Sequence, residues 1–215
     1  MRGVDQDPSA GSAPRSARSE HRSIQSERRV WVGEDEGQTA LIVGGVVQSV
    51  VVSDGPFGPG YWPLMLPDVR PGRALILGLG GGTIAHLLAR RFGDVLITGV
   101  ENDPAVLRLA RGAFDLASLN LEVVEDDAFA FVARAHEPFD YVAVDLFAKG
   151  AIPGAIFGRP FLRRVRDLLT PGGLAAFNFF KDRRRESRLA RLEAVFPRVR
   201  LIESRDNLVA MCRRR

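Results

Sequence analysis

Two kinds of hydrophobic pattern alternate from residue 73 to the end of the chain. Short apolar runs without polar alternation are typical of strands that are buried on both faces of a parallel sheet. Between these runs, apolar residues recur at helical spacing, as at Ile84, Leu87 and Leu88. We therefore expect strands at Ala74–Leu77, Val95–Val100, Leu121–Val124, Tyr141–Asp145, Ala175–Phe179, Val199–Glu203 and Leu208–Cys212, and helices at Thr83–Arg91, Pro104–Phe114, Ala128–Ala135, Pro160–Leu169 and Arg184–Val195.

The order of these segments predicts an α/β domain over residues 73–215. Only residues 204–207 separate the last two predicted strands, which is too short a segment for a crossover helix. These strands must therefore form a hairpin, so that one strand runs antiparallel to an otherwise parallel sheet. Pro171, Gly172 and Gly173 predict a tight turn into the fifth strand.

The part of the chain before residue 73 has a different pattern. Residues 1–28 are rich in Ser, Arg, Ala, Gly and Pro and have almost no large apolar side chains. Such a segment cannot bury enough surface to offset its ordering entropy, so we expect a disordered tail. Residues 29–72 predict a small β-unit and a linking loop, because β-rich runs flank the hairpin signal Gly44-Gly45 and prolines and glycines follow them.

Composition narrows the class of protein. The chain has 215 residues, of which 46% are hydrophobic, enough for one full α/β core with a small appendage. No apolar run approaches the ~20 residues that span a bilayer, and no signal-peptide core is recognisable. Cys212 is the one cysteine, which excludes an internal disulfide framework and a Cys-based zinc cluster. We expect a cytoplasmic protein without a metal and without a membrane partner.

The net charge of +4 raises the question of nucleic-acid binding. The basic residues are nearly all arginines, and clusters such as Arg183–Arg185 and Arg213–Arg215 lie near the end of the chain. Aromatic residues are not interleaved with them as in a binding surface. The sequence therefore disfavours a nucleic-acid partner.

A glycine-rich loop joins the first predicted strand of the α/β domain to its helix. Its residues Gly78, Leu79, Gly80, Gly81 and Gly82 allow a sharp turn and a close approach of bare backbone to a ligand. Thr83 is expected to cap the helix that follows. Strand, glycine loop and helix together hold nucleotide-like ligands at a helix N-terminus, although a plain tight turn gives the same pattern.

The second strand ends in a carboxylate. Glu101 lies 21 residues beyond Gly80 (101 − 80), about where an acidic residue binds ribose hydroxyls in such folds. Asn102, Asp103 and Pro104 then open the next helix with a cap residue and an N1 proline. Loop and carboxylate together favour a nucleoside-binding site.

Four segments resemble motifs of the spermidine synthase-like branch of the class I S-adenosylmethionine (SAM)-dependent methyltransferase superfamily. Leu41–Gln48 is similar to that family's Leu-Asp-Gly-x-x-Gln hairpin, and Tyr61–Met65 stands where the family has Tyr-His-Glu-Met. Gly78–Thr83 stands where it has Gly-Gly-Gly-Asp-Gly-Gly, and Asp140–Lys149 where it has a strand ending in Asp-Ser-Ser-Asp-Pro. The resemblance implies a Rossmann-like, seven-stranded fold of this class with a small N-terminal β-hairpin unit.

The resemblance also implies roles for single residues. Asp126 matches an aspartate that accepts a hydrogen bond from adenine, and either it or Asp127 is expected to cap the next helix instead. Asp145 matches the carboxylate that takes a proton from the attacking group, although orienting a loop is an alternative role. Tyr61 and Gln48 are the other candidates on the acceptor side. The expected cofactor-binding set is Gly78, Leu79, Gly80, Gly81, Gly82, Glu101, Asn102, Asp126, Asp127 and Asp145.

Departures from the family pattern concern the acceptor. Gly81, Ala148 and Pro63 stand where the family has carboxylates, and each change removes an anion that would pair with a cationic group. The residues expected to line the pocket are instead Tyr61, Trp62, Leu146 and Phe147. This favours an apolar or aromatic small-molecule acceptor.

The sequence therefore favours methyl transfer from intact SAM, without a metal. Two alternatives stay open: aminopropyl transfer from decarboxylated SAM, as in polyamine synthesis, and a non-catalytic nucleoside-binding protein. The sequence does not identify the acceptor, and it leaves open whether the protein forms a homodimer.

Overall fold

The computed structural model describes residues 30–52, 60–147 and 151–215. The expected tail at residues 1–28 and the departure at Ala148 lie outside these ranges. None of the helices within them is long and apolar enough to cross a membrane.

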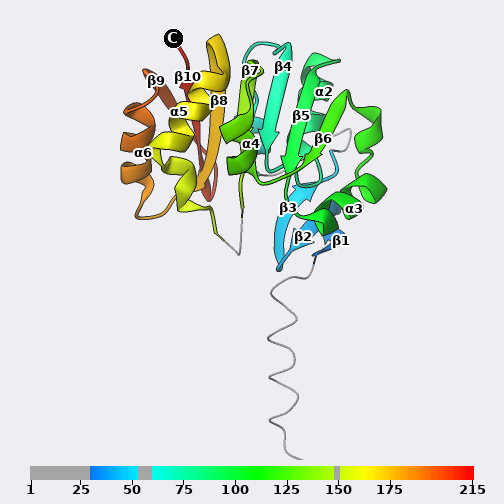
Figure 1. The fold of residues 1–215 in the computed structure, drawn as a ribbon. Coiled ribbons are helices and arrows are strands. Elements are labelled where there is room, and N and C mark those ends of the chain that lie inside the picture. The colour runs from blue at the N-terminus through cyan, green and yellow to red at the C-terminus, as the bar shows by residue number, and fades with distance from the viewer. Residues whose placement is uncertain (1–29, 53–59, 148–150) are drawn as a thin grey trace, which may run out of the picture.

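A seven-stranded sheet forms the centre of the molecule (Figure 1). Its strand order is β6-β5-β4-β7-β8-β10-β9, and β10 runs antiparallel to both β8 and β9. This confirms the expected terminal hairpin and the single antiparallel strand. The strands are β4 (Arg73–Leu77), β5 (Leu96–Glu101), β6 (Leu121–Glu125), β7 (Phe139–Val144), β8 (Leu169–Phe180), β9 (Arg198–Glu203) and β10 (Asn207–Arg213).

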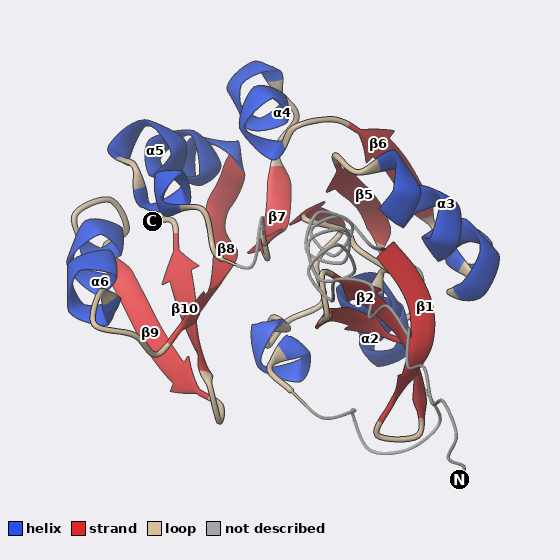
Figure 2. Ribbon diagram, turned by 90° about the horizontal axis from the view of Figure 1, so that it is seen from below, coloured by secondary structure: helices blue, strands red, loops and turns tan. Residues whose placement is uncertain are grey.

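Helices cover both faces of this sheet (Figure 2). One core lies between the sheet and helices α2 (Thr83–Phe92) and α3 (Pro104–Ala113). The other lies between the sheet and helices α4 (Ala128–Arg134), α5 (Arg159–Leu168) and α6 (Arg185–Glu193). In β4, Ile76 joins the first core and Leu75 and Leu77 join the second, all at most 1% exposed. Burial on both faces explains why this strand is an unbroken apolar run.

A separate three-stranded sheet precedes the α/β domain, as expected from the hairpin signal. It consists of β1 (Val30–Asp35), β2 (Gln38–Val43) and β3 (Val46–Val50), in that order and antiparallel. Gly44 and Gly45 have φ of 58° and 84°, which suits a two-residue turn with both central residues left-handed. Ala40, Leu41 and Val50 are buried in the core that contains α2 and α3. A short 3-10 helix, Trp62–Met65, follows the sheet.

Two local details differ from what the sequence predicts. Thr83 does not cap α2: the N-cap is Gly82, and the Thr83 hydroxyl instead donates to Val50 O (2.8 Å) and accepts from Val50 N (2.9 Å). Because β3 docks here, the Thr83 hydroxyl bonds to this strand and does not cap the helix. The turn expected at Pro171–Gly173 lies inside β8, because the strand begins at Leu169, paired with Phe139, and Gly172 has φ of 79°. The register of β7 and β8 shifts between Phe139 and Tyr141, which accommodates these residues as an irregularity within the strand.

Candidate functional site

The glycine loop is fixed to the ends of two neighbouring strands. The amides of Gly78 and Leu79 both donate to Val100 O, at 2.9 and 3.0 Å. Gly78 has φ of +87°, and a Cβ there would lie 2.3 Å from the carbonyl oxygen of Asp145. A residue with a side chain would therefore strain the backbone and collide with the segment that follows β7. The loop and Asp145 are thus in direct contact.

Glu101 faces this loop from the end of β5. Its Oε2 accepts from Gly80 N (3.0 Å), and its Oε1 accepts from Asn102 N (2.9 Å) and Asp103 N (3.1 Å). Burial raises the pKa of Glu101 above its usual range, while these three backbone bonds act in the opposite direction. The carboxylate is therefore held rigidly beside Gly80, with acceptor capacity left for a donor such as a hydroxyl. The side chain of Asn102 is exposed at the same strand end.

The two aspartates after β6 have different roles in the structure. Asp127 is the N-cap of α4, and its Oδ1 accepts from Phe129 N and Ala130 N at 2.9 and 3.0 Å. Asp126 donates its amide to Glu101 O (3.0 Å) and pairs its carboxylate with Arg134. Asp126 therefore lies beside Glu101, and one of the two expected possibilities, that Asp127 caps the helix, is realised.

Asp145 accepts hydrogen bonds from side chains of two other segments. The hydroxyl of Tyr61 donates to both of its oxygens, at 3.0 and 2.9 Å, and Asn178 Nδ2 donates to Oδ1 at 2.8 Å. Burial raises the pKa of Asp145 to about 6, against the lowering effect of bonds from Asn178, Tyr61 and Trp62. Burial and the neighbouring Asp145 raise the pKa of Tyr61 well above its usual value. A carboxyl that titrates near neutral pH is suited to accepting a proton.

Gln48 lies on β3 beside the loop, but no contact links its side chain to Asp145 or Tyr61. Its backbone oxygen accepts from Ser49 Oγ (2.7 Å) and lies 3.6 Å from the position of a Cβ at Gly80. Ser49 Oγ in turn accepts from Gly81 N (2.7 Å). The structure thus brings β3 against the glycine loop and leaves the role of Gln48 as a proposal.

Sequence reasoning missed three polar residues that the structure places here: Ser49, Asn178 and Asn207. Asn178 is 6% exposed and interrupts the apolar run Ala175–Phe180. A polar residue within a strand buried on both faces needs a buried partner, and this signal was available in the sequence. Ser49 and Asn207 give no comparable local signal.

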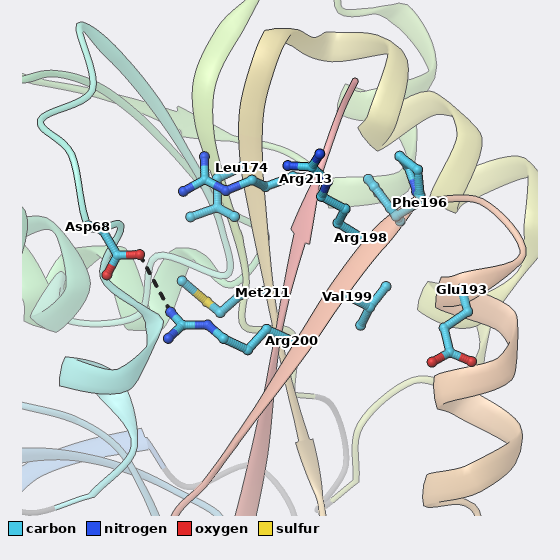
Figure 3. Close-up of a pocket in the computed structure, with 10 residues that line it drawn as sticks. Asp68, Leu174, Glu193, Phe196, Arg198, Val199, Arg200, Met211 and Arg213 are labelled. Atoms are coloured by element: carbon cyan, nitrogen blue, oxygen red, sulfur yellow. Dashed lines mark ion pairs between the residues drawn. The ribbon is translucent and has the colours of Figure 1, made fainter.

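Two cavities lie away from this site. One of about 610 Å³ is lined by Asp68, Leu174, Met211 and arginines of β9 and β10, and Arg200 pairs with Asp68 at 3.5 Å (Figure 3). A neighbouring cavity of about 300 Å³ includes Asp140, near the start of β7. Both lie near the amino ends of β7 and β8, whereas Asp145 follows the carboxyl end of β7. Within the described ranges, no three His, Cys, Asp or Glu side chains come together as metal ligands would.

Comparison with known proteins gives consistent matches. Residues 74–173 match a family model described as a methyltransferase domain. A curated relative from Bifidobacterium longum, a probable polyamine aminopropyl transferase, is 34% identical over 136 residues, which are 61% of this chain and 30% of the relative. Other curated relatives are named polyamine aminopropyltransferase, N-terminal histidine N-methyltransferase, or eEF1A lysine and N-terminal methyltransferase. The matches span 30% of the Bifidobacterium longum relative, 40% of the polyamine aminopropyltransferase from Vibrio vulnificus, and 24% and 22% of the two methyltransferases.

Solved structures extend the likeness to nearly all the described residues. A probable spermidine synthase from Corynebacterium glutamicum superposes with a TM-score of 0.72 at 24% identity, over 86% of this chain and 76% of that chain. Human methyltransferase-like protein 13, in complex with SAH, superposes with a TM-score of 0.62 at 28% identity, over 71% of this chain and 76% of that chain. The first likeness shows the fold alone.

Proposed function

Because the chain belongs to the spermidine synthase-like branch of the class I SAM-dependent methyltransferase superfamily, we propose that it transfers a methyl group from SAM to an apolar or aromatic small molecule. A nucleoside has hydroxyl and amino groups that can donate hydrogen bonds to the carboxylates at the ends of β5 and β6. Glu101 keeps acceptor capacity for ribose hydroxyls beside Gly80, and Asp126 lies next to it for the adenine end. Asn102 and the glycine loop complete the proposed nucleoside site.

The surroundings of Gly81 are the observation that favours methyl transfer over aminopropyl transfer. The resemblance assigns an ammonium-binding aspartate to this position. A Cβ at Gly81 would lie 2.8 Å from Phe114 and 2.9 Å from Ser49 Cβ, so the position has no room for a carboxylate. The ammonium of decarboxylated SAM therefore lacks this partner, and a Gly81→Asp substitution is expected to disrupt the loop rather than to supply one.

The loop amides do not explain the preference for intact SAM. Each amide from Gly78 to Gly82 already has a partner within the chain: Val100 O for Gly78 and Leu79, Glu101 for Gly80, Ser49 for Gly81 and Leu79 O for Gly82. A carboxylate of SAM would instead be favoured by the positive partial charge at the N-terminus of α2. The preference thus depends mainly on the missing partner for an ammonium.

Asp145 and Tyr61 are the proposed catalytic pair. SAM supplies a methyl carbon whose bond to sulfur breaks, with its electron pair left on sulfur, as the acceptor's lone pair forms the new bond. Asp145 takes the proton that the acceptor loses, since its pKa of about 6 leaves it mostly ionised at neutral pH. Both oxygens of Asp145 accept from Tyr61, so the Tyr61 hydroxyl must turn toward the acceptor as the proton arrives. Positioning of the two substrates supplies most of the remaining rate enhancement.

Apolar side chains beside Asp145 support the proposed acceptor class. Leu146 and Phe147 follow it directly and are half-buried, and the ring of Phe147 meets that of Phe180 edge to face at 6.0 Å. Tyr61 packs on Trp62 at 4.9 Å between centroids. Among these described side chains, only Asp145 is an anion that could pair with a polyamine.

Titration calorimetry tests the proposal. We expect SAM to bind in the micromolar range, on the order of −8 kcal/mol, and at least about tenfold more tightly than decarboxylated SAM. Glu101→Ala should weaken SAM binding by roughly 1.5–3 kcal/mol, the usual cost of losing a hydrogen bond to a charged group. Glu122→Ala, which removes an exposed carboxylate from neighbouring β6, is the matched control and should bind normally.

Three outcomes contradict the proposal in different ways. Tighter binding of decarboxylated SAM, with an aminopropyl product formed from a diamine, would establish the activity for which the Bifidobacterium longum relative is named. Binding of SAM without methyl transfer to any of a panel of apolar and aromatic acceptors or peptides would favour the non-catalytic alternative. No binding of either nucleoside would exclude both enzyme functions.

A further inference from the structure

Two buried asparagines connect Asp145 to the β9–β10 hairpin. Asn178 lies near the end of β8, and Asn207 begins β10, the antiparallel neighbour of β8. Asn207 Nδ2 donates to Asn178 Oδ1 (2.9 Å), and Asn178 Nδ2 donates to Asp145 Oδ1 (2.8 Å). The two asparagines are 6% and 9% exposed. The bond between the two asparagines is buried, and the bond from Asn178 to Asp145 is part-buried.

The direction of these two hydrogen bonds determines which group of Asn178 faces Asp145. An asparagine can present either its NH₂ group or its carbonyl to a neighbour. The bond from Asn207 occupies the carbonyl of Asn178, so the NH₂ group of Asn178 faces Asp145. A donor stabilises the ionised carboxylate, whereas a carbonyl in its place would require the protonated form.

The hairpin itself holds Asn207 in place. Ser204 N donates to Asn207 O (2.9 Å), and Asn207 N donates to Ser204 Oγ (3.3 Å), which closes the turn between β9 and β10. The backbone of Asn207 is thus held by a turn that is separate from the proposed nucleoside site and from Asp145.

We propose that Asn178 and Asn207 are positioning residues that act in series to keep Asp145 ionised and its Oδ1 fixed. This inference rests on the proposed function, in which Asp145 accepts the acceptor's proton. Among the residues that the structure describes, the other groups that face Asp145 are Tyr61 and Trp62, next to and within the 3-10 helix, and Tyr141 on β7. All three are neutral around pH 6, and within the described ranges the two asparagines supply the hydrogen-bond donor opposite them.

The test is a pH titration of the ligand-free protein labelled with ¹³C at the aspartate carboxyl carbons, with Asp145→Asn to assign the signal. Asn178→Leu should raise the titration midpoint of Asp145 by at least about one pH unit, a tenfold change in ionisation constant. Asn207→Leu should raise it by at least about half a unit, although this residue does not touch Asp145. The double variant should shift it no further than Asn178→Leu alone, because residues that act in series are not additive.

Ser204→Thr is the matched control, since it alters the same turn but keeps the hydroxyl oxygen that accepts from Asn207 N and leaves both asparagines in place. In this variant the titration midpoint of Asp145 should stay within about 0.2 pH units of the parent value. An unchanged midpoint in Asn207→Leu, or additive shifts in the double variant, would overturn the proposal. Should leucine at position 207 prevent folding, Asn207→Ser is too short to reach Asn178 and gives the same readout. No nucleoside is needed, so failure here is distinct from failure of SAM binding by calorimetry.

The fluorescence of Trp62 gives an independent measurement. Trp31 and Trp62 are the two tryptophans of the sequence, so Trp31→Phe leaves Trp62 as the single reporter beside Asp145. Its emission should change with the same midpoints as the carboxyl signal. The inference is supported if the fluorescence and carboxyl midpoints agree in the parent and both shift in the asparagine variants. A Trp62 midpoint that is unaffected by Asn207→Leu would contradict it.

Discussion

At Asp145, burial and hydrogen bonding oppose each other. Burial raises the pKa of this carboxyl to about 6, so the folded protein holds a proton there that the unfolded chain releases between about pH 4 and pH 6. The folded state therefore loses stability as the pH rises through this window. We predict that Asp145→Asn gains stability relative to the parent between pH 4 and pH 7, by an amount on the order of 3 kcal/mol. Urea unfolding of both proteins at several pH values measures this difference.

Asp140 provides a control of opposite sign. Burial raises its pKa, but bonds from the amides of Arg73 and Gly72 and the hydroxyl of Thr170 outweigh this and lower it. A carboxyl with a lowered pKa stabilises the folded state above its usual range, and that stability is lost as the pH falls. Asp140→Asn should therefore lose stability relative to the parent as the pH rises. Parallel curves for the two variants would show that the local environment of Asp145 is not as described.

At the scale of the element, the glycine loop is rigid because its backbone has no space for side chains. Gly78 combines φ of +87° with the contact to Asp145 O, so Gly78→Ala should distort the junction of β4, α2 and β7. We predict loss of at least about 2 kcal/mol of stability, of the order expected for strain at such a position, and loss of detectable SAM binding. Thermal unfolding and calorimetry measure the two effects.

Gly112 is the matched control for this substitution. It lies in α3 at an exposed position, and a Cβ there would meet no atom within 4 Å. Gly112→Ala should leave binding unchanged and raise stability by roughly 0.5–1 kcal/mol, since alanine is the better helix former. Equal losses in both variants would show that the loop is not specially constrained.

At the scale of the whole molecule, the N-terminal sheet is joined to the α/β domain through the glycine loop and the start of α2. The hydroxyl of Thr83 bonds both backbone groups of Val50, and Ser49 bonds Gly81. Thr83→Val keeps the shape of the side chain but leaves the buried amide and carbonyl of Val50 without these bonds. We predict a loss of about 1–3 kcal/mol in the free energy of unfolding, measured with denaturant.

The exposed Ser118 is the comparison for Thr83. Its hydroxyl donates to Asp115 O (2.9 Å) at the surface, where water can replace the bond. Ser118→Ala should change stability by no more than about 0.5 kcal/mol. If Thr83→Val costs as little, the sheet and the domain are not coupled through this contact.

The sequence by itself determined the strands, the helices and the position of Glu101 beside the glycine loop. Strands buried on both faces need unbroken apolar runs, and helices need the 3.6-residue period, so local pattern sets these elements. Glu101 and the glycine loop were found for the same reason, because a strand end and a fixed spacing place them together. Element ends moved by a few residues at most, except in β8, where pairing with β7 begins at Leu169, before the expected turn.

Only the tertiary structure decided which polar groups meet. Asn178 is separated by 33 residues from Asp145 and by 29 from Asn207, and Thr83 is 33 residues from Val50. These contacts depend on the register of β10 against β8 and on the docking of β3 over the glycine loop. Register is fixed by the packing of whole sheet faces, and no local pattern in the sequence encodes it. Thr83, which could have capped its own helix, therefore bonds to a distant strand instead. The partner of each buried polar group is set by the packing of the whole fold.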